Sequence, residues 1–371
     1  MVESYNKRTE TELKIKKISI IGLGLIGGSI AKALQKSKYN FHVSAFDRAD
    51  TLSKALDDKT INKTLSTVEE ALNSDLIFLS LPVASAIEVF DQIAPKLKTN
   101  TILTDVCSVK NVFKERWDKI ESNGSYIGGH PMTGKEKGGY ENSDPLLFEN
   151  SLYILTEERC NSSFFNDFQK IISSFGSNIL HIPAKQHDVI AASVSHLPQL
   201  VSVALVNAAS LKTDNYNFLD LAAGGFRDMT RIASSDFSIW ESIIANNKNQ
   251  ILTALDKFSY DLSLLIKQIK ENNFEAIKSF FETARINRDE IPKNTKGFLN
   301  PLFDLFVFVT DKPGAISKIS TALYQAGINI KDMELLKIRE GAGGTFRLSF
   351  ATSDEVKKAS EILKKIGFET A

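Results

Sequence analysis

The stretch that decides the fold lies near the N-terminus, where residues 16–34 read KKISIIGLGLIGGSIAKAL. Its first six residues form a short β-branched run with three isoleucines, which predicts a strand, and the pattern from Leu25 onward has helical spacing. Gly22, Gly24 and Gly27 therefore occupy a strand-to-helix turn, and they match the spacing GxGxxG. A strand, this turn and a helix together indicate the first βαβ unit of a dinucleotide-binding domain.

The same stretch predicts a binding site for NAD. The backbone amides that open the helix, including those of Leu25 and Ile26, are positioned to bind a pyrophosphate. Asp47 follows Gly27 by 20 residues and ends the second predicted strand. An acid at that position accepts hydrogen bonds from both ribose hydroxyls and repels a 2′-phosphate, which favours NAD over NADP. The adjacent Arg48 leaves some use of NADP open, because a guanidinium can bind that phosphate.

The order of predicted elements divides the chain into three domains. Apolar runs bounded by turn residues predict strands at 16–21, 41–46, 75–81, 101–106, 126–127, 152–155 and 178–182. Helical stretches alternate with the earlier strands, so we expect an α/β, Rossmann-type doubly wound parallel sheet over residues 1–183. Residues 184–292 read as helices. The turn-rich segment 291–301 is a linker, and residues 300–371 follow the βαββαβ order of a small α+β domain.

One segment of the helical domain is apolar on nearly every face. Residues 189–209 read VIAASVSHLPQLVSVALVNAA, which is typical of a helix buried on all sides, either inside its domain or against a second subunit. We therefore expect a homodimer. Pro198 should kink this helix, because proline lacks the backbone donor and clashes with the preceding turn.

Charge and cysteine content limit the kinds of partner. Lys and Arg together number 45, as do Asp and Glu, so no net field draws the chain to nucleic acid or to a membrane, and the expected partner is a small molecule. Cys107 and Cys160 have neither disulfide nor metal-ligand spacing, so we expect free thiols and no metal site. The apolar run 18–30 contains four glycines and makes a poor signal helix. No other segment is expected to approach the length of a membrane span, which predicts a cytoplasmic protein.

Two further motifs place polar side chains near strand ends. DVCSVK (105–110) contains Ser108, and GGHPMTGKEKGG (128–139) contains His130 just past a predicted strand end. Open parallel sheets bind ligands outside the carboxyl ends of their strands, where both residues would lie. A lone histidine is more often simply solvated or bonded within the structure. At this position, however, a neutral imidazole with an ordinary pKa of about 6.5 can accept a proton from a substrate hydroxyl.

A third motif carries two arginines four residues apart. In AAGGFRDMTRIASSDFSIW (222–240), Arg227 and Arg231 share one face if the segment is helical. Both could form surface ion pairs, with Asp228 as one partner. The alternative is that they bind a substrate carboxylate, because a guanidinium makes two parallel hydrogen bonds to it.

Taken together, GLGLIGGS, DVCSVK, GGHPMTGKEKGG, SHLPQ and GGFRDMTRIASSDFSIW, in this order and at these separations, resemble the prephenate dehydrogenase family of tyrosine biosynthesis. The resemblance runs from about Lys14 to the C-terminus, and the final segment, with DKPGAIS and AGINI, looks like an amino-acid-sensing ACT domain. The family implies NAD-dependent oxidative decarboxylation of prephenate to 4-hydroxyphenylpyruvate.

The resemblance also implies roles for individual residues. His130 is the hydrogen-bond acceptor for the 4-hydroxyl of the substrate, Ser108 orients that imidazole, and Arg231 binds a substrate carboxylate. Further positions that match residues lining or supporting the pocket are His187, His196, Gln199 and Trp240. The family's usual SHLPH reads SHLPQ here, so Gln199 offers an amide without a positive charge. This departure leaves arogenate open as the alternative substrate.

For the ACT-like domain we expect tyrosine to bind between paired domains near Asp311, Gly314 and Asn329 and to inhibit the enzyme, because a DxPG turn before a helix leaves backbone amides free for a carboxylate. A purely structural, dimerising module is the alternative. For the whole chain, two other functions remain open: a β-hydroxyacid dehydrogenase, which would rely on a lysine base, and a non-catalytic sensor of NAD and amino acids.

Overall fold

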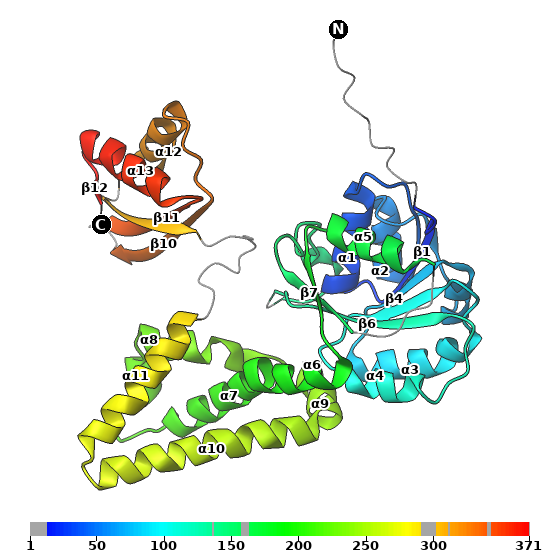
Figure 1. Cartoon of the computed structure of the whole chain (residues 1–371), viewed down its shortest axis with the longest axis horizontal. Helices are drawn as coiled ribbons and strands as arrows, with labels where there is room; N and C mark the ends of the chain where they lie inside the picture. The colour runs from blue at the N-terminus through cyan, green and yellow to red at the C-terminus, as the bar shows by residue number, and fades with distance from the viewer. Residues whose placement is uncertain are drawn as a thin grey trace. The chain divides into compact units, whose positions relative to one another are not determined.

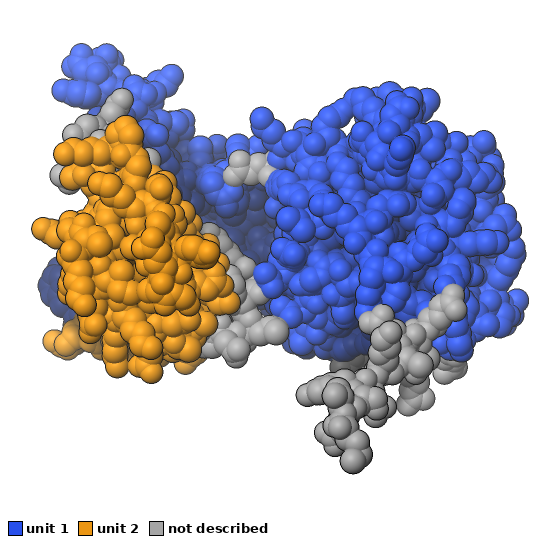
Figure 2. Space-filling model, turned by 90° about the horizontal axis from the view of Figure 1, so that it is seen from above, with its two compact units in different colours: residues 1–274 blue, residues 275–371 orange. Residues whose placement is uncertain are grey.

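The computed structural model describes residues 13–135, 137–156, 163–290, 302–310, 312–339 and 343–370. The chain forms two compact units, residues 1–274 and 275–371 (Figure 2). The first unit contains both the predicted nucleotide-binding domain and most of the predicted helical domain. The division into three domains therefore stays a prediction of the sequence.

The first unit is built on one eight-stranded sheet of order β3-β2-β1-β4-β5-β6-β7-β8 (Figure 1). The strands are β1 (Lys17–Ile21), β2 (His42–Phe46), β3 (Lys63–Thr64), β4 (Leu76–Leu79), β5 (Ile102–Asp105), β6 (Ser125–Pro131), β7 (Leu152–Leu155) and β8 (Asn178–His181). The helices between them are α1 (Leu25–Lys36), α2 (Ala49–Asp57), α3 (Val83–Ile93), α4 (Asn111–Trp117) and α5 (Phe165–Ser174), with 3-10 turns η1 (Val68–Asn73), η2 (Ala94–Lys96) and η3 (Tyr140–Asn142).

The predicted Rossmann-type sheet is confirmed, but it is not parallel throughout. In the sheet order β3-β2-β1-β4-β5-β6 each pair of neighbours is parallel, whereas β7 pairs antiparallel with β6 and parallel with β8. A parallel return needs a long crossover, usually an α-helix. In the described residues between β6 and β7, the helical structure is limited to the 3-10 turn η3, so the chain returns antiparallel.

Apolar residues fill both faces of the sheet, and β4 shows how. Leu76 and Phe78 belong to the apolar cluster that includes residues of α1 and α5, whereas Ile77 and Leu79 belong to the cluster that includes residues of α3 and α4. Because both faces are covered, the strands read as continuous apolar runs rather than as alternating ones. The core therefore fixes the carboxyl ends of β1, β4, β5 and β6 at one edge, where the site is built.

The helical part of the chain comprises α6 (Ala184–Ala191), η4 (Ala192–His196), α7 (Leu197–Ala209), η5 (Phe218–Leu221), α8 (Gly224–Thr230), η6 (Arg231–Ser234), α9 (Phe237–Asn246), α10 (Lys248–Lys270) and α11 (Phe274–Glu290). Within the first unit, α6 contacts α4 and α9 contacts α3. The η4 segment is a π-helical turn that ends two residues before Pro198. Proline has no N–H for the carbonyl four residues earlier, so the widened turn lies where the sequence predicts a kink.

The apolar helix is less buried than expected. Within residues Ala184–Ala209, an 18-residue window has a mean hydropathy of 1.8, and only 28% of that window is buried. Val194, for example, is 62% exposed. By length and composition this helix could cross a membrane, so the expectation that no other segment approaches a membrane span is wrong. Its buried residues include polar ones such as His187, His196 and Gln199; one face is therefore polar and fixed within the unit, and the other is apolar and exposed.

The C-terminal unit confirms the βαββαβ order. Its elements after α11 are β9 (Phe303–Val309), α12 (Ala315–Gln325), β10 (Asp332–Arg339), β11 (Gly343–Phe350), α13 (Ser353–Lys365) and β12 (Glu369–Thr370). The antiparallel sheet has the order β10-β11-β9-β12. Its apolar core joins the sheet to both helices through residues such as Val307, Leu323, Leu348 and Leu363.

Candidate active site

The glycine-rich turn has room for a ligand at one position. Gly22 has a φ of +95°, and a Cβ there would lie 2.5 Å from the carbonyl oxygen of Ser80. A Cβ at Gly27 would lie 1.9 Å from the oxygen of Gly22, so close packing requires both glycines. A Cβ at Gly24 would meet no protein atom within 4 Å. No side chain caps the N-terminus of α1. The turn therefore fits a dinucleotide, whose pyrophosphate would approach Gly24 and the amides of Leu25 and Ile26.

Asp47 lies against this turn, as the sequence predicts. Its Oδ2 accepts a hydrogen bond from the backbone N–H of Leu23 at 2.5 Å, and its Oδ1 accepts one from the N–H of Arg48 at 2.6 Å. These bonds fix the carboxylate at the end of β2. The Nε of Arg48 lies 3.8 Å from Asp50, and the Arg48 side chain is 81% exposed. Contacts of Asp47 and Arg48 with a ribose remain predictions.

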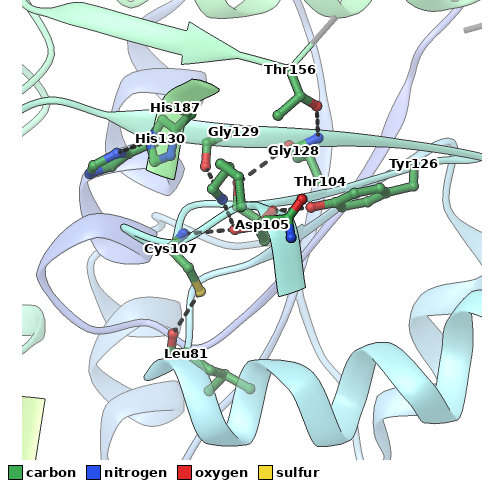
Figure 3. A network of polar contacts seen from close by, with 12 residues as sticks. Leu81, Thr104, Asp105, Cys107, Tyr126, Gly128, Gly129, His130, Thr156 and His187 are labelled. Carbon is green, nitrogen blue, oxygen red and sulfur yellow. Dashed lines mark hydrogen bonds and ion pairs between the residues drawn. The ribbon is translucent and has the colours of Figure 1, made fainter. Parts of the chain in front are cut away.

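Asp105, which is labelled in Figure 3, belongs to a buried ion pair next to His130 and its neighbours in β6. Asp105 ends β5, Lys110 precedes α4, and neither side chain is exposed. The ammonium of Lys110 pairs with Asp105 and donates to the backbone oxygen of Gly129 at 2.7 Å. Asp105 also accepts from the hydroxyl of Tyr126 at 2.6 Å and from the backbone N–H of Cys107 at 2.9 Å. Both charges are therefore compensated within the protein, as buried charges must be.

Sequence reasoning missed this pair, although a signal was present. Asp105 and Lys110 are the two charged residues of DVCSVK, directly after a buried strand. Charged side chains at such a place need partners when the chain folds. Cys107 is a free thiol whose pKa is raised by burial and by the charge of Asp105. Cys160 lies outside the described residues.

His130 belongs to a chain of three side chains from two elements. It is the next-to-last residue of β6, rather than just past the strand end as expected, because Gly128 and Gly129 continue the strand. Its Nδ1 lies 2.8 Å from the Nε2 of His187, and the Nδ1 of His187 lies 2.8 Å from the Oδ1 of Asp188. Figure 3 shows the two rings side by side. The strand presents one histidine, and α6 presents the other together with the aspartate.

The surroundings of His130 keep its imidazole neutral. Burial lowers its pKa well below the ordinary value, and the charge of Lys110 acts in the same direction. Both effects disfavour the cationic form. At neutral pH the ring therefore has a lone pair that can accept a hydrogen bond or a proton.

Ser108 lies between Cys107 and Lys110 in the loop that joins β5 to α4, and its side chain is half-buried. In the part of the chain that the structure describes, no hydrogen bond joins it to His130, whose Nδ1 bonds His187 instead. The orienting role of Ser108 stays a prediction of the family resemblance. His187 was placed near the pocket, but its direct bond to His130 was not foreseen.

His196 and Trp240 form a second buried group. Their rings meet edge to face with centroids 5.9 Å apart, and His196 is only 1% exposed. Burial lowers the pKa of His196 to about 4. Its Nδ1 lies 3.3 Å from the side-chain nitrogen of Asn247, which also donates to the backbone oxygen of Asp188 at 2.8 Å. This group is thus connected to the residues that hold His130.

Gln199 connects α7 to the arginine motif. Its Nε2 donates to the backbone oxygen of Ile232 at 2.9 Å, and its side chain is buried. Ile232 directly follows Arg231 in η6, so this bond holds the turn that carries the arginine. Arg227 and Arg231 are both exposed in the single chain. Carboxylate binding by Arg231 stays a prediction.

In the C-terminal unit, Gly314 begins α12 with a φ of +85°. It lines a cavity of about 460 Å³ together with Thr310, Ala315, Leu335 and Phe346. Asn329 is exposed and does not line this cavity, and Asp311 lies outside the described residues. The regulatory role of these three residues is a prediction.

The glycine turn, the acid bonded to it and the neutral histidine at the same sheet edge define a dinucleotide-dependent dehydrogenase. Comparison with known proteins agrees. The model of the prephenate dehydrogenase nucleotide-binding domain matches residues 30–181, that of the prephenate dehydrogenase dimerization domain matches 183–283, and that of the ACT domain matches 303–368.

Individual relatives extend over nearly the whole chain. The prephenate dehydrogenase of Lactococcus lactis subsp. cremoris is 33% identical over 95% of this chain and 98% of its own length. That of Bacillus subtilis is 30% identical over 94% of this chain and 95% of its own length. The crystal structure of prephenate dehydrogenase from A. aeolicus in complex with hydroxyphenyl propionate and NAD+ superposes with a TM-score of 0.68 at 28% identity, covering 75% of this chain and 99% of that one.

The chain therefore belongs to the prephenate dehydrogenase family. The predictions of an NAD-dependent oxidoreductase with a C-terminal ACT domain are confirmed.

Proposed function

We propose that this protein oxidises prephenate with NAD to 4-hydroxyphenylpyruvate and CO2. The observation that carries the proposal is the neutral, oriented His130 at the edge of the sheet where the glycine turn lies. When bound, NAD supplies the hydride acceptor. The ring nitrogen of His130 that does not face His187 accepts a hydrogen bond from the 4-hydroxyl of the substrate. As hydride leaves C4 and the ring carboxylate leaves as CO2, the ring becomes aromatic.

The charges around the site favour prephenate over arogenate. Prephenate has a keto group where arogenate has an ammonium, and an ammonium is best matched by a carboxylate. None of the predicted pocket residues, His187, His196, Gln199, Arg231 and Trp240, is acidic. The carboxylate of Asp188 already accepts three hydrogen bonds, two from backbone N–H groups and one from His187. A substrate with two carboxylates and a ketone fits this set better than one with an ammonium.

Three further parts of the proposal concern assembly, regulation and location. We infer that two chains pair through the exposed apolar face of the helical part, to which Val194, Val203 and Leu252 contribute. Tyrosine is the proposed effector of the ACT domain, because the largely apolar cavity beside Gly314 suits an aromatic side chain. We place the enzyme in the cytoplasm, since the apolar helix Ala184–Ala209 carries buried polar residues of the site.

The test is NADH formation by the purified full chain with NAD and either prephenate or arogenate, with and without tyrosine. Turnover of prephenate that tyrosine reduces is the expected result. Turnover of arogenate alone would contradict the choice of substrate, and would make Gln199 the first residue to replace by histidine. A rate that tyrosine leaves unchanged, with no heat of tyrosine binding to the full chain in calorimetry, would refute the choice of effector.

A further inference from the structure

We propose that Asp188 is a positioning residue that acts through His187 to fix which ring nitrogen of His130 carries the proton. The consequence for catalysis rests on the proposed role of His130 as acceptor, but the arrangement of protons can be measured independently. The proposal also gives a use to the charged residues of DVCSVK, which the chemistry of the reaction leaves unexplained.

Asp188 determines which ring nitrogen of His187 carries a proton. A carboxylate offers only acceptors, so the close contact between the Oδ1 of Asp188 and the Nδ1 of His187, at 2.8 Å, requires a proton on that nitrogen. The other donors to Asp188 are the backbone N–H groups of Lys110 at 2.8 Å and Asn111 at 2.9 Å. These two bonds compensate much of the carboxylate charge, so Asp188 does not need a cationic partner.

The position of the proton on His187 determines the position of the proton on His130. His187 is only 1% exposed, and in the proposed relay its imidazole is neutral. A neutral His187 with its proton on Nδ1 has a lone pair on Nε2, which must accept from the Nδ1 of His130 at 2.8 Å. The proton of His130 is thereby placed on Nδ1, and its Nε2 has the lone pair that a substrate hydroxyl requires. Ser-His-Asp hydrolases use an aspartate to fix a histidine tautomer in the same way.

Lys110 fixes the positions of Asp188 and His130 relative to each other. Lys110 holds both ends of the relay, because its backbone N–H bonds Asp188 and its ammonium bonds the carbonyl of Gly129, the residue before His130. The ion pair with Asp105 fixes the ammonium in turn. Strand β6 and helix α6 are therefore tied to the same residue, and the two rings cannot separate without breaking a buried hydrogen bond.

The direct test is the 15N NMR spectrum of the full-length protein with labelled histidine, since the shifts of the two ring nitrogens report the tautomer. The chain has five histidines, so single substitutions suffice for assignment. At neutral pH we expect both His130 and His187 to be neutral with the proton on Nδ1. A cationic His187, or a proton on the Nε2 of His130, would overturn the proposal. This measurement stands whether or not prephenate is the substrate.

Asp188→Asn should reverse the relay. An amide nitrogen facing His187 donates, which moves the proton of His187 to Nε2 and that of His130 to Nε2. We expect this tautomer change and a fall in kcat of about 10²- to 10⁴-fold. The matched control is Asp75→Asn, because Asp75 also accepts from two backbone N–H groups, those of Lys16 and Lys17, at 2.8 and 2.9 Å, but contacts no histidine. The control should leave both tautomers as in the wild type.

A second pair of variants keeps the test valid if Asp188→Asn fails to fold. His187→Gln retains an oxygen acceptor near the position of Nε2, whereas His187→Leu removes it. We expect His187→Leu to lower kcat at least about tenfold more than His187→Gln. In the His187→Gln background, Asp188→Asn should cost less than about threefold, because coupled residues are not additive. If Asp188→Asn lowered kcat by the same factor in the wild type and in the His187→Gln variant, the role of Asp188 would be merely structural. A wild type inactive with both substrates would refute the proposed function alone.

Discussion

Replacing Lys110 by methionine should destabilise the first unit strongly. The lysine and its partner Asp105 are both fully buried, and the substitution leaves the carboxylate without its cation. The hydroxyl of Tyr126 and the N–H of Cys107 still donate to Asp105, but neither supplies a positive charge. Removing one partner of a buried ion pair costs about 3–5 kcal/mol. For a unit of this size each kcal/mol lowers Tm by about 2–4 °C, so we expect a fall of about 10 °C.

The assay is thermal and urea unfolding of the full chain at neutral pH, followed by circular dichroism. Lys114→Met is the matched control, because Lys114 forms an ion pair with Asp118 on the exposed side of α4 and its loss should cost below about 1 kcal/mol. The double variant Asp105→Asn with Lys110→Met has no unpaired charge and should regain at least about 2 kcal/mol. A Lys110→Met protein within about 1 kcal/mol of the wild type, or a double variant less stable than the single one, would refute the reasoning.

Three shorter predictions concern the cofactor turn and the histidines. Gly24→Ala should leave Tm unchanged, since the added Cβ meets no protein atom within 4 Å. The same Cβ should weaken NAD binding, measured by calorimetry, at least about tenfold, and an unchanged affinity would place the pyrophosphate elsewhere. The acid limb of kcat/KM should lie below pH 6.5, because burial and nearby charges lower the pKa of His130, and a limb above 6.5 would contradict a neutral acceptor. The pKa of His196 is about 4 in the folded chain and about 6.5 in the unfolded chain, so the unfolded chain takes up a proton first as the pH falls. The free energy of unfolding therefore contains about 3 kcal/mol that is present above pH 6.5 and is lost as the pH falls toward 4. In His196→Asn, unfolding free energies at pH 7.5 and 5.0 should therefore differ less than in the wild type, and an equal difference would assign the acid loss to other groups.

The sequence predicted most strands because the sheet is covered on both faces. Runs such as Leu76–Leu79 are apolar without interruption, which marks a buried strand even in a single sequence. Strand β3 was missed because it is two polar residues, Lys63 and Thr64, at the edge of the sheet. Strand β6 was predicted too short, since glycines usually end a strand. Here the strand passes so close to Asp105 that a Cβ at Gly129 would lie 2.7 Å from the backbone oxygen of Asp105. Glycine is therefore required inside this strand and does not end it.

The direction of β7 could not be predicted from local pattern. A four-residue apolar run such as Leu152–Leu155 reads the same in a parallel or an antiparallel pair. Its direction follows from the path of the connection after β6, where a 3-10 turn stands in place of a crossover helix. The weak sequence signal in that connection carries no information about where the chain returns to the sheet.

The site was predicted where a motif is local and missed where bonds join distant segments. The glycine turn and Asp47 are one strand and one helix apart, so their spacing is diagnostic. The bond between Lys110 and Asp188 joins residues 78 positions apart. A charged residue in a sequence is by default assigned to the solvent, and only the fold shows that these two are buried and compensated.

The apolar helix combines two requirements that a sequence pattern cannot separate. Between Val194, which is 62% exposed, and His196, which is 1% exposed, lies a single residue of the π-helical turn. The turn ends two residues before Pro198, and the next polar residue, Gln199, faces inward and donates to the carbonyl of Ile232. In the single chain the segment is thus two-sided, with apolar residues on its outer face and polar residues of the candidate site on its inner face. The apolar face proposed for the dimer contact and the buried polar residues of the candidate site therefore lie on opposite faces of one helical segment.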